Sequence, residues 1–428
     1  MEKLIIDGGI PLHGTVTPSG NKNEALPALA AALLTDEEVV LSNVPLIGDA
    51  RTIAGLVADL GADVTWSDDH RVTIRAQHLR TTVLNPALCR SARASILLAG
   101  PTLARCGTVD LYPPGGCKIG RRRVDTHFLA FEALGATVDA GETFVIRAPH
   151  GLHGQDLFLD EASVTATENA IMAAVLAKGT TVIRNAACEP HVQGLCRLLT
   201  AMGAQIDGIG SNILTIQGVD RLHGAEHRIG PDIVEVGSFI GMAAATGGGV
   251  TIRQAAPEHL RMILLEFAKL GVQAEVRGDD VFIPSGQTLK AVPEVNGGVP
   301  KLDDGPWPQF PTDLMSVLIV VATQAAGTVL VFEKMFENRL FFVDSLIQMG
   351  AQIVLCDPHR AVVVGPSVLR GGVVVSPDIR AGIALVIAAL CAKGRSEIRN
   401  IGQIDRGYER IDGRLRALGA RVERIAEE

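Results

Sequence analysis

The chain has 428 residues, 47% of them hydrophobic, which predicts two or three domains with well-filled cores. Its 39 basic and 47 acidic residues give a net charge of −8, and aromatic residues make up only 4%. This balance argues against a nucleic-acid binder that relies on a broad basic surface or on base stacking, so we expect no nucleic-acid partner.

The apolar stretches are too short to cross a bilayer. The most apolar, at 314–323 and 383–391, fall well below the roughly 18 to 20 residues that a membrane span needs. The opening MEKLIIDGGI also lacks the long apolar region of a signal peptide, so we expect a cytoplasmic protein. Seven scattered cysteines without a CxxC pair indicate neither a disulfide framework nor a zinc site, and we expect no metal or cofactor.

One sequence signature recurs six times along the chain. Each copy is an amphipathic, helix-like stretch ending in Leu or Met, then a glycine, then a short alternating segment typical of a strand. The glycine suits the left-handed cap that ends a helix. The six glycines are Gly61, Gly135, Gly203, Gly271, Gly350 and Gly419.

A second signature alternates with the first. It consists of an Ala- and Leu-rich helix, a Gly or acidic turn and a β-branched strand, as in AVLAKGTTVIRNAA and ATQAAGTVLVFEKM. Each repeat therefore predicts helix, strand, helix, strand, strand. Units of about 70 residues are too large for most solenoids, so we expect six compact α/β units grouped as two domains of three.

Basic residues stand at the predicted helix starts, in chain order. Lys22, with Asn23, follows SGN, and arginines occupy comparable places in other repeats: Arg93, Arg122, Arg339, Arg380 and Arg406. Each alone is more typical of a solvated surface charge. Together, at repeat-equivalent positions, they indicate helix ends that converge on a polyanionic ligand.

Cys117 lies between a glycine pair and a run of three arginines, in PPGGCKIGRRR. Neighbouring cations lower the pKa of a thiol and raise its thiolate fraction. The segment alone fits two interpretations equally: a nucleophile or proton donor on a mobile loop, and a flexible basic loop with an incidental cysteine.

Asp313 opens an otherwise apolar helix in FPTDLMSVLIVV. It fits a simple first-turn stabiliser, and in a cation-rich cleft it also fits a general base acting on a hydroxyl. The motifs GxSxG, HExxH, GxxxxGK[ST] and GxGxxG are absent from the sequence. This argues against a serine hydrolase, a zincin, a P-loop nucleotidase and a classical dehydrogenase.

The motifs SGNKNEALP, RASILLAGP, PPGGCKIGRR, SVTATENAIMAA, FPTDLM, FENR, DIRAG and IDRGYERI resemble those of the UDP-N-acetylglucosamine enolpyruvyl transferases. The resemblance runs through the whole chain. It implies an inside-out α/β barrel pair built from six βαβαββ-like units, three per domain. We expect one domain at 22–231, the other at 1–21 plus 232–428, and the active site in the cleft between them.

The resemblance also implies an activity: transfer of enolpyruvyl from phosphoenolpyruvate to the 3′-hydroxyl of UDP-N-acetylglucosamine, with release of phosphate. This is the first committed step of peptidoglycan synthesis, on which cell-wall growth, cell shape and division depend. The catalytic residues would be Lys22, Cys117, Asp313 and Arg406. Cys117 would give a proton to the methylene carbon and would be the thiol that fosfomycin alkylates, while Asp313 would accept the hydroxyl proton.

The implied binding residues fall into two sets. The phosphoenolpyruvate set is Lys22, Asn23, Arg122, Arg339, Arg380 and Arg406. The UDP-N-acetylglucosamine set is Asn23, Arg93, Arg122, Arg123, Val124, Asp125, Thr126, Ser163, Val164, Asp313 and Met335.

The chain departs from the family pattern at Gly48, Arg123, Glu161, Thr165 and Ile233. All five would lie near the nucleotide or at positions that are commonly basic. Arg123 replaces a usual proline, Thr165 replaces a usual glycine, and Ile233 stands where arginine is often found. These changes bear on the acceptor more than on the reaction. Three alternatives stay open: an enolpyruvyl transferase with a different nucleotide or nucleoside acceptor, a non-catalytic regulatory paralogue that binds the UDP-sugar, and, most distantly, an RNA-processing relative.

Overall fold

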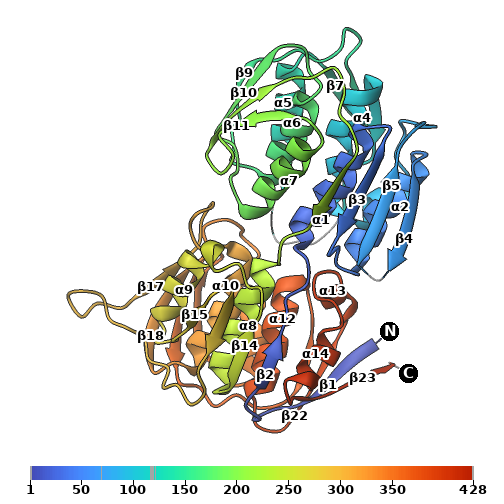
Figure 1. The fold of residues 1–428 in the computed structure, drawn as a ribbon. Helices are drawn as coiled ribbons and strands as arrows, with labels where there is room; N and C mark the ends of the chain where they lie inside the picture. The colour runs from blue at the N-terminus through green and yellow to red at the C-terminus, as the bar shows by residue number, and fades with distance from the viewer. Residues whose placement is uncertain (1, 69, 116–119, 121, 427–428) are drawn as a thin grey trace. The chain divides into compact units, whose positions relative to one another are not determined.

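The computed structural model describes residues 2–68, 70–115, 120 and 122–426. Its contacts divide the chain into two compact units (Figure 1). The 20–230 unit holds residues 20–115 and 122–230. The terminal unit holds residues 2–19, 120 and 231–426, so it joins the first strands of the chain to its second half.

The 20–230 unit contains three repeats. Its helices are α1 (Lys22–Ala31), η1 (Ala32–Leu34), α2 (Gly48–Asp59), α3 (Pro86–Ser91), η2 (Arg93–Leu98), α4 (Ala99–Cys106), α5 (Asp125–Ala133), α6 (Val164–Ala174) and α7 (Pro190–Ala201). Its strands are β3 (Glu38–Ser42), β4 (Asp63–Asp68), β5 (Arg71–Arg75), β6 (Thr108–Leu111), β7 (Thr137–Ala140), β8 (Phe144–Arg147), β9 (Asp156–Phe158), β10 (Thr180–Arg184), β11 (Gln205–Asp207), β12 (Ile213–Gln217) and β13 (Ala225–Arg228).

The terminal unit contains the other three repeats. Its helices are α8 (Ile233–Thr246), η3 (Pro257–His259), α9 (Arg261–Ala268), α10 (Thr312–Gln324), α11 (Val343–Gln348), α12 (Ile379–Cys391), α13 (Gly402–Asp405) and α14 (Ile411–Ala417). Its strands are β1 (Glu2–Asp7), β2 (His13–Val16), β14 (Gly249–Ile252), β15 (Glu275–Arg277), β16 (Asp280–Ile283), β17 (Lys301–Asp303), β18 (Gly327–Phe332), β19 (Gln352–Asp357), β20 (Arg360–Gly365), β21 (Val373–Val375), β22 (Arg395–Arg399) and β23 (Arg421–Ala426).

Six small sheets repeat one pairing pattern in the described residues. In five of them a parallel pair is followed by two antiparallel pairs, as in β17-β18-β20-β19 and β9-β10-β12-β11. In the sixth, β6-β8-β7, a parallel bridge between Val83 and Asp110 stands in place of the first strand. The last repeat along the chain forms the sheet β21-β22-β1-β23. Its final strand is β1, which comes from the start of the chain. The predicted six-fold helix and strand order is confirmed.

The six repeat glycines have the predicted conformation. Their φ angles lie between 79° and 114°, in the region that residues with a Cβ atom rarely adopt. Each follows the last turn of a helix and precedes a strand or extended segment. The glycines therefore end the helices by the left-handed cap that the sequence predicts.

The core of the terminal unit is formed by α8, α10 and α12, which contact one another and lie inside the three sheets (Figure 1). Their central residues are buried around the full circumference, as expected for helices that are apolar on every side. In the 20–230 unit, α1 packs against η2, and both η2 and α4 pack against α6. Since the first helix of every repeat is central, the polar residues at its start are held by a rigid core.

Two segments, 19–21 and 230–232, connect the units and pair with each other. The N–H of Asn21 donates to the carbonyl of Gly230 (2.7 Å), and the N–H of Asp232 donates to the carbonyl of Ser19 (2.9 Å). Asn21 and Asp232 are also the N-caps of α1 and α8. Both crossings thus use the same local structure.

A glutamate three residues after each cap strengthens this pairing. Glu24 accepts from the N–H of Gly230 (3.2 Å), and Glu235 accepts from the N–H of Ser19 (2.7 Å). In an ordinary capping box this glutamate accepts a hydrogen bond from the N–H of its own cap residue. Here it accepts instead from an N–H of the other connecting segment. Arg414 forms an ion pair with Glu235 and donates to the carbonyl of Thr17 (2.6 Å). Within each unit, the residues beside the connections are therefore held by backbone and charged contacts.

In the part of the chain that the structure describes, no helix has the length and apolar character needed to cross a membrane.

Candidate active site

Asp313 is the second residue of α10, where the free amides at the helix start favour a carboxylate. Its Oδ1 accepts from Nη2 of Arg339 (2.8 Å), and its Oδ2 accepts from Nε and Nη2 of Arg380 (2.9 and 2.8 Å). The Asp313 side chain remains 29% exposed, whereas the two arginine side chains are 2% and 6% exposed. One accessible carboxylate is thus held between two buried cations.

Arg380 begins α12 under several constraints. The side chain of Asp378 caps this helix and accepts from the N–H of Arg380 (2.8 Å), while Ser316 of α10 donates to the carbonyl of Arg380 (2.9 Å). Burial acts to lower the pKa of Arg380, but the charge of Asp313 together with contributions from Tyr408 and Asp232 outweighs it and raises this pKa, so the guanidinium stays protonated.

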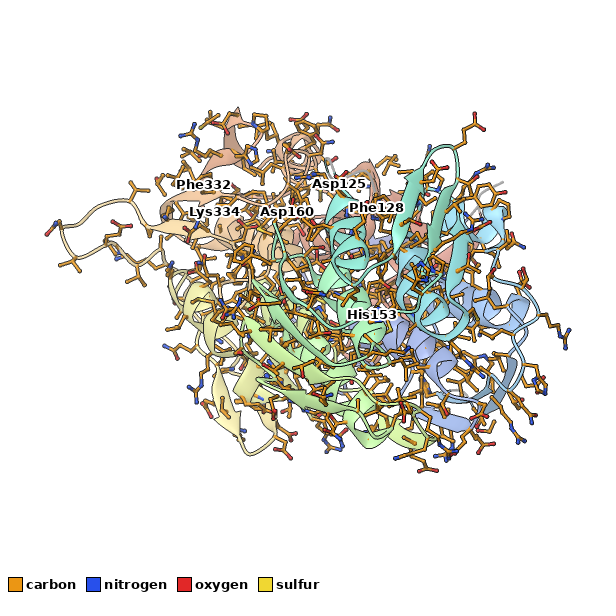
Figure 2. All side chains as sticks on the ribbon, turned by 90° about the horizontal axis from the view of Figure 1, so that it is seen from above. Asp125, Phe128, His153, Asp160, Phe332 and Lys334 are labelled. Carbon is orange, nitrogen blue, oxygen red and sulfur yellow. The ribbon has the colours of Figure 1, made fainter. Side chains whose placement is uncertain are left out.

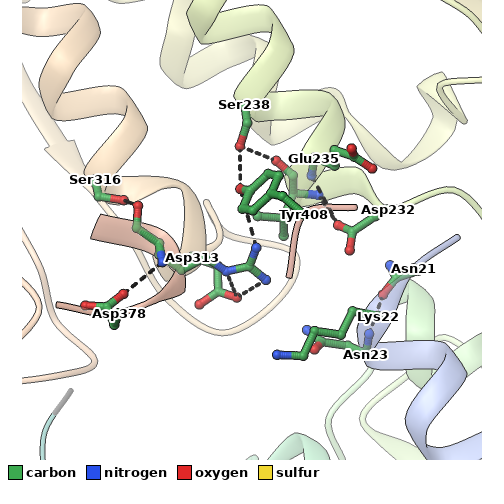
Figure 3. Close-up of polar contacts among 12 residues, drawn as sticks. Asn21, Lys22, Asn23, Asp232, Glu235, Ser238, Asp313, Ser316, Asp378 and Tyr408 are labelled. Atoms are coloured by element: carbon green, nitrogen blue, oxygen red, sulfur yellow. Dashed lines mark hydrogen bonds and ion pairs between the residues drawn. The ribbon is translucent and has the colours of Figure 1, made fainter. Parts of the chain in front are cut away.

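Tyr408 lies on the other side of Arg380. Its hydroxyl accepts from Nη1 of Arg380 (3.4 Å) and shares a hydrogen bond with Ser238 of α8 (2.8 Å), as can be followed around Asp313 and Tyr408 in Figure 3. We call Asp313, Arg339, Arg380 and Tyr408 the Asp313 cluster. Three core helices and the segment after α13 contribute to its contacts, so it is preorganised by the packing of the unit.

Arg339 and Met335 belong to the segment that follows β18. Nε of Arg339 is buried and has no hydrogen-bond partner among the described residues, so this side chain keeps an unused donor. Arg406 is half-buried at the end of α13 and donates to Gln403 (3.2 Å). The predicted residues of the terminal unit therefore lie on the starts of α10 and α12 and on the segments after β18 and α13.

Lys22 and Asn23 open α1 in the 20–230 unit. The side chain of Asn21 caps this helix and accepts from the N–H groups of Asn23 (2.9 Å) and Glu24 (3.3 Å). The Lys22 ammonium forms an ion pair with Asp49 in the first turn of α2 (2.9 Å). Both side chains are largely buried, so the lysine is held in place by a carboxylate; Figure 3 labels Lys22 and Asn23.

Arg93 starts η2 and supports the backbone after the cysteine loop. Its Nη2 donates to the carbonyls of Arg122 (2.7 Å) and Arg123 (3.0 Å). Burial, reinforced by the positive charge of Arg122, lowers the pKa of Arg93 to about 10, so it remains a cation at neutral pH. The Arg122 side chain is exposed.

Arg123 connects two acidic residues at the surface. Its Nε donates to Asp125 (2.8 Å) and its Nη2 to Asp160 (3.4 Å), and Asp160 also accepts from the hydroxyl of Thr126 (2.6 Å). We call Arg93, Arg123, Asp125, Thr126 and Asp160 the Arg123 cluster. Asp125 and Asp160 are labelled in Figure 2. This cluster joins the start of α5 to the segment before α6.

Ser163 caps α6, and its hydroxyl accepts from the N–H of Ala166 (3.4 Å); Val164 is the first residue of that helix. Thr165, where the family pattern has glycine, forms a hydrogen bond with Nε2 of His127 (3.1 Å). Burial, with a contribution from Arg93, lowers the pKa of His127 to about 3, so its ring is neutral. Thr165 therefore gives a buried imidazole a partner.

Cys117 lies outside the described residues. Among the residues that are described, no group of three or more His, Cys, Asp and Glu side chains is arranged to hold a metal ion.

Several contact residues of the site were not predicted. Tyr408 and Asp378 lie inside quoted motifs, and Asp378 carries a recognisable signal because an aspartate just before a helix is a common cap. Ser238 and Asp160 carry no comparable signal. Their roles depend on which helices pack together, which local sequence does not show.

Comparisons with known proteins agree with this fold. The sequence profile of EPSP synthase (3-phosphoshikimate 1-carboxyvinyltransferase) matches residues 6–415. The chain is similar to a structure of the enolpyruvyl transferase NikO from Streptomyces tendae, with a TM-score of 0.88, 23% identity, and coverage of 100% of this chain and 99% of that one. It is also similar to EPSP synthase from Acinetobacter baumannii, with a TM-score of 0.77, 18% identity and full coverage of both chains. The fold is that of the enolpyruvyl transferases.

Closer relatives carry one name. UDP-N-acetylglucosamine 1-carboxyvinyltransferase of Bradyrhizobium diazoefficiens is 57% identical over 425 residues, covering 99% of this chain and 98% of the relative. The protein of the same name from Treponema denticola is 53% identical over 423 residues, covering 99% of each chain. The chain belongs to the UDP-N-acetylglucosamine 1-carboxyvinyltransferase family, and it is a transferase.

Proposed function

We propose that the protein transfers the enolpyruvyl group of phosphoenolpyruvate to the 3′-hydroxyl of UDP-N-acetylglucosamine and releases phosphate. The observation that carries this proposal is the accessible carboxylate of Asp313 between the buried guanidinium groups of Arg339 and Arg380. A hydroxyl that attacks C2 of an enol phosphate needs a base, and the anionic substrate needs cations beside it. The full-length relatives named for this activity support the same conclusion.

In the proposed mechanism the sugar hydroxyl attacks C2 of phosphoenolpyruvate while C3 gains a proton. Asp313 accepts the hydroxyl proton, and Cys117 gives the proton to C3. The resulting tetrahedral adduct then loses a proton from C3 and expels phosphate, which restores the double bond in the product. Acid and base must act together, because C2 becomes a strong electrophile only as C3 is protonated.

The phosphoenolpyruvate site is assigned to six residues with cationic or hydrogen-bonding groups. Lys22, Arg122 and Arg406 hold its phosphate, and Arg339 and Arg380 lie near its carboxylate. Asn23 completes the set. The substrate carboxylate accepts a hydrogen bond from Nε of Arg339, which has no partner among the described residues. It also draws positive charge away from Asp313, which leaves this carboxylate more able to accept a proton.

The acceptor site is assigned to residues mostly of the 20–230 unit. Arg93 contacts the diphosphate, Asn23 contacts the sugar, and Asp313 faces the reacting hydroxyl. The full set is Asn23, Arg93, Arg122, Arg123, Val124, Asp125, Thr126, Ser163, Val164, Asp313 and Met335. We propose that the two units act as the two catalytic domains and that the enzyme works in the cytoplasm, where it feeds peptidoglycan synthesis.

Product analysis with a panel of acceptors tests this proposal. The protein is incubated with phosphoenolpyruvate and one acceptor at a time: UDP-N-acetylglucosamine, UDP-glucose, uridine or shikimate 3-phosphate. The mass of each acceptor after the reaction is measured by mass spectrometry. We expect only UDP-N-acetylglucosamine to gain one enolpyruvyl group. Modification of another acceptor in its place would contradict the substrate assignment, and no modified acceptor with folded protein would point to a regulatory paralogue.

A further inference from the structure

A pair of acidic residues lies behind the Asp313 cluster. Asp304 directly follows β17, and Glu333 directly follows β18. The two strands are parallel, and Asp303 is the register partner of Phe332. The residues that follow them, Asp304 and Glu333, therefore lie side by side at the same end of the two strands. Both acidic residues are completely buried. Two buried carboxyl groups at one position require an explanation.

Glu333 holds the two segments that carry Asp313 and Arg339. Its carboxyl group accepts from the hydroxyl of Thr312, at 3.0 Å to Oε1 and 2.9 Å to Oε2. Its Oε1 also accepts from the N–H groups of Met335 (3.0 Å) and Phe336 (3.1 Å). Thr312 directly precedes Asp313, and the other two donors lead to Arg339. One carboxyl group therefore joins the start of α10 to the segment after β18.

Asp304 completes the arrangement from the other side. Its Oδ1 accepts from the N–H of Lys334 (2.6 Å). Its Oδ2 is buried and has no hydrogen-bond partner among the described residues. A proton on Glu333 would supply the missing donor, because two carboxyl groups in contact cannot both ionise in a buried site.

We propose that Glu333 and Asp304 share one proton, and that this acid pair is a positioning element for the transfer reaction because it sets the orientation of Asp313 and Arg339. Neither acid contacts a substrate. The inference rests on the proposed roles of Asp313 and Arg339, and the shared proton can be tested apart from them.

The surroundings of the pair favour the shared proton at neutral pH. Burial, followed by the hydrogen bond and charge of Asp304, raises the pKa of Glu333 to about 8, although Arg339 and Thr312 oppose the shift. His359, in the turn between β19 and β20, donates from Nδ1 to the carbonyl of Glu333 (2.7 Å) and does not reach its carboxyl group.

The remaining nearby charges are engaged elsewhere. Arg339 is bonded to Asp313, and the ammonium of Lys334 pairs with Asp303 (2.6 Å) and lies 5.9 Å from the ring of Phe332, which is labelled with it in Figure 2. Above a pH of about 8, loss of the shared proton would place two like charges behind the Asp313 cluster. Activity should then decline on the alkaline side as the two segments separate.

Four variants test the proposal: Glu333→Gln, Glu333→Ala, Asp304→Asn and Val331→Ala. The glutamine amide can donate to Asp304 and its oxygen can accept from the segment amides, so E333Q imitates the protonated acid. We expect E333Q to keep kcat within about three-fold of wild type at pH 7 and to lose less activity than wild type between pH 7 and 9. E333A should lower kcat at least about ten-fold, since small displacements of catalytic groups have effects of this size or larger.

Binding and stability measurements separate positioning from general damage. The dissociation constant of UDP-N-acetylglucosamine should change by less than about three-fold in E333A, because most of its proposed contacts lie in the other unit. Val331 is fully buried in the same strand, so V331A is a matched control that should lower Tm without a comparable loss of kcat. Wild-type kcat in E333A, or an equal loss in V331A, would overturn the positioning role.

Infrared difference spectroscopy tests the proton without relying on turnover. At pH 7 the wild type should show a protonated-carboxyl carbonyl band that is lost in E333Q and shifted or lost in D304N. If that band is present in a protein without transferase activity, the shared proton stands and the proposed function fails. If wild type and E333Q have the same protonated-carboxyl bands, the shared proton is overturned whatever the activity.

Discussion

The Asp313 cluster and the Arg123 cluster hold their charges in opposite ways. In the Asp313 cluster both arginines are almost completely buried, and core helices contribute their contacts. In the Arg123 cluster the ion pairs involve side chains that are 38% to 60% exposed, on segments near the cysteine loop. We infer that the proposed base side of the site, at the Asp313 cluster, is fixed before substrates bind, whereas the proposed nucleotide side, at the Arg123 cluster, can adapt to sequence change.

This difference accounts for the position of Arg123, one of the departures from the family pattern. Arg123 takes the place of a usual proline in the exposed cluster, where its neighbours Asp125 and Asp160 provide new partners. Thr165 replaces a usual glycine and hydrogen-bonds His127. No departure falls on Asp313, Arg339 or Arg380. A buried charged group would lose partners that no nearby residue could replace.

The largest effect is expected from Asp313→Ala. Removing the base should lower kcat by about 10² to 10⁴, while UDP-N-acetylglucosamine still binds. Steady-state kinetics and calorimetric titration of the sugar nucleotide measure the two effects separately. A variant with a near-wild-type rate would remove Asp313 from the base role.

Arg380→Ala should cause the largest loss of stability. It leaves Asp313 with one buried partner and Tyr408 without its guanidinium neighbour, and breaking a buried pair costs about 3–5 kcal/mol of unfolding free energy. Denaturant unfolding measures this loss. The matched control is Arg395→Ala, whose ion pair with Asp7 is exposed and should contribute little. Equal stability losses in the two variants would contradict the contrast between buried and exposed charges.

Cys117→Asp should separate catalysis from drug sensitivity. A carboxylic acid can deliver the proton to C3, so we expect turnover to persist, but it lacks the thiolate that fosfomycin alkylates. Activity after drug treatment and the mass of the loop peptide provide the measurements. Exposed Cys106 is the control position, and C106A should stay sensitive. Equal inactivation of wild type and C117D by the drug would refute the assignment.

Arg123→Ala should have the smallest effect. Exposed ion pairs contribute little, so we expect the KM for UDP-N-acetylglucosamine to rise less than about five-fold. The KM for phosphoenolpyruvate should not change, since Arg123 is assigned to the acceptor alone. Arg221→Ala is a suitable control, because Arg221 also forms an exposed ion pair, with Glu37. A loss of kcat as large as that of D313A would show that the nucleotide side is as preorganised as the base side.

The repeat architecture could be read from sequence because each repeat carries its own signal. A glycine such as Gly61 is required by local backbone geometry, and an apolar run such as that of α10 indicates a buried helix wherever it packs. Each cation at a helix start could likewise be identified from the sequence that immediately surrounds it. These features depend on neighbours in sequence, so sequence is sufficient to predict them.

The contacts within the site depend on tertiary packing and could not be predicted. Asp313 meets Arg380 because α10 and α12 share a core, and Ser238 reaches Tyr408 because α8 joins them. Asp304 and Glu333 come together only through the register of two parallel strands. No spacing in the sequence encodes such a register directly.

The most direct test of the account is release of phosphate from phosphoenolpyruvate by the wild-type protein, with and without UDP-N-acetylglucosamine. We predict sustained release only when the sugar nucleotide is present, one phosphate for each enolpyruvyl product. Folded protein that releases no phosphate with the acceptor present, or that releases it equally without the acceptor, would contradict the proposed transfer.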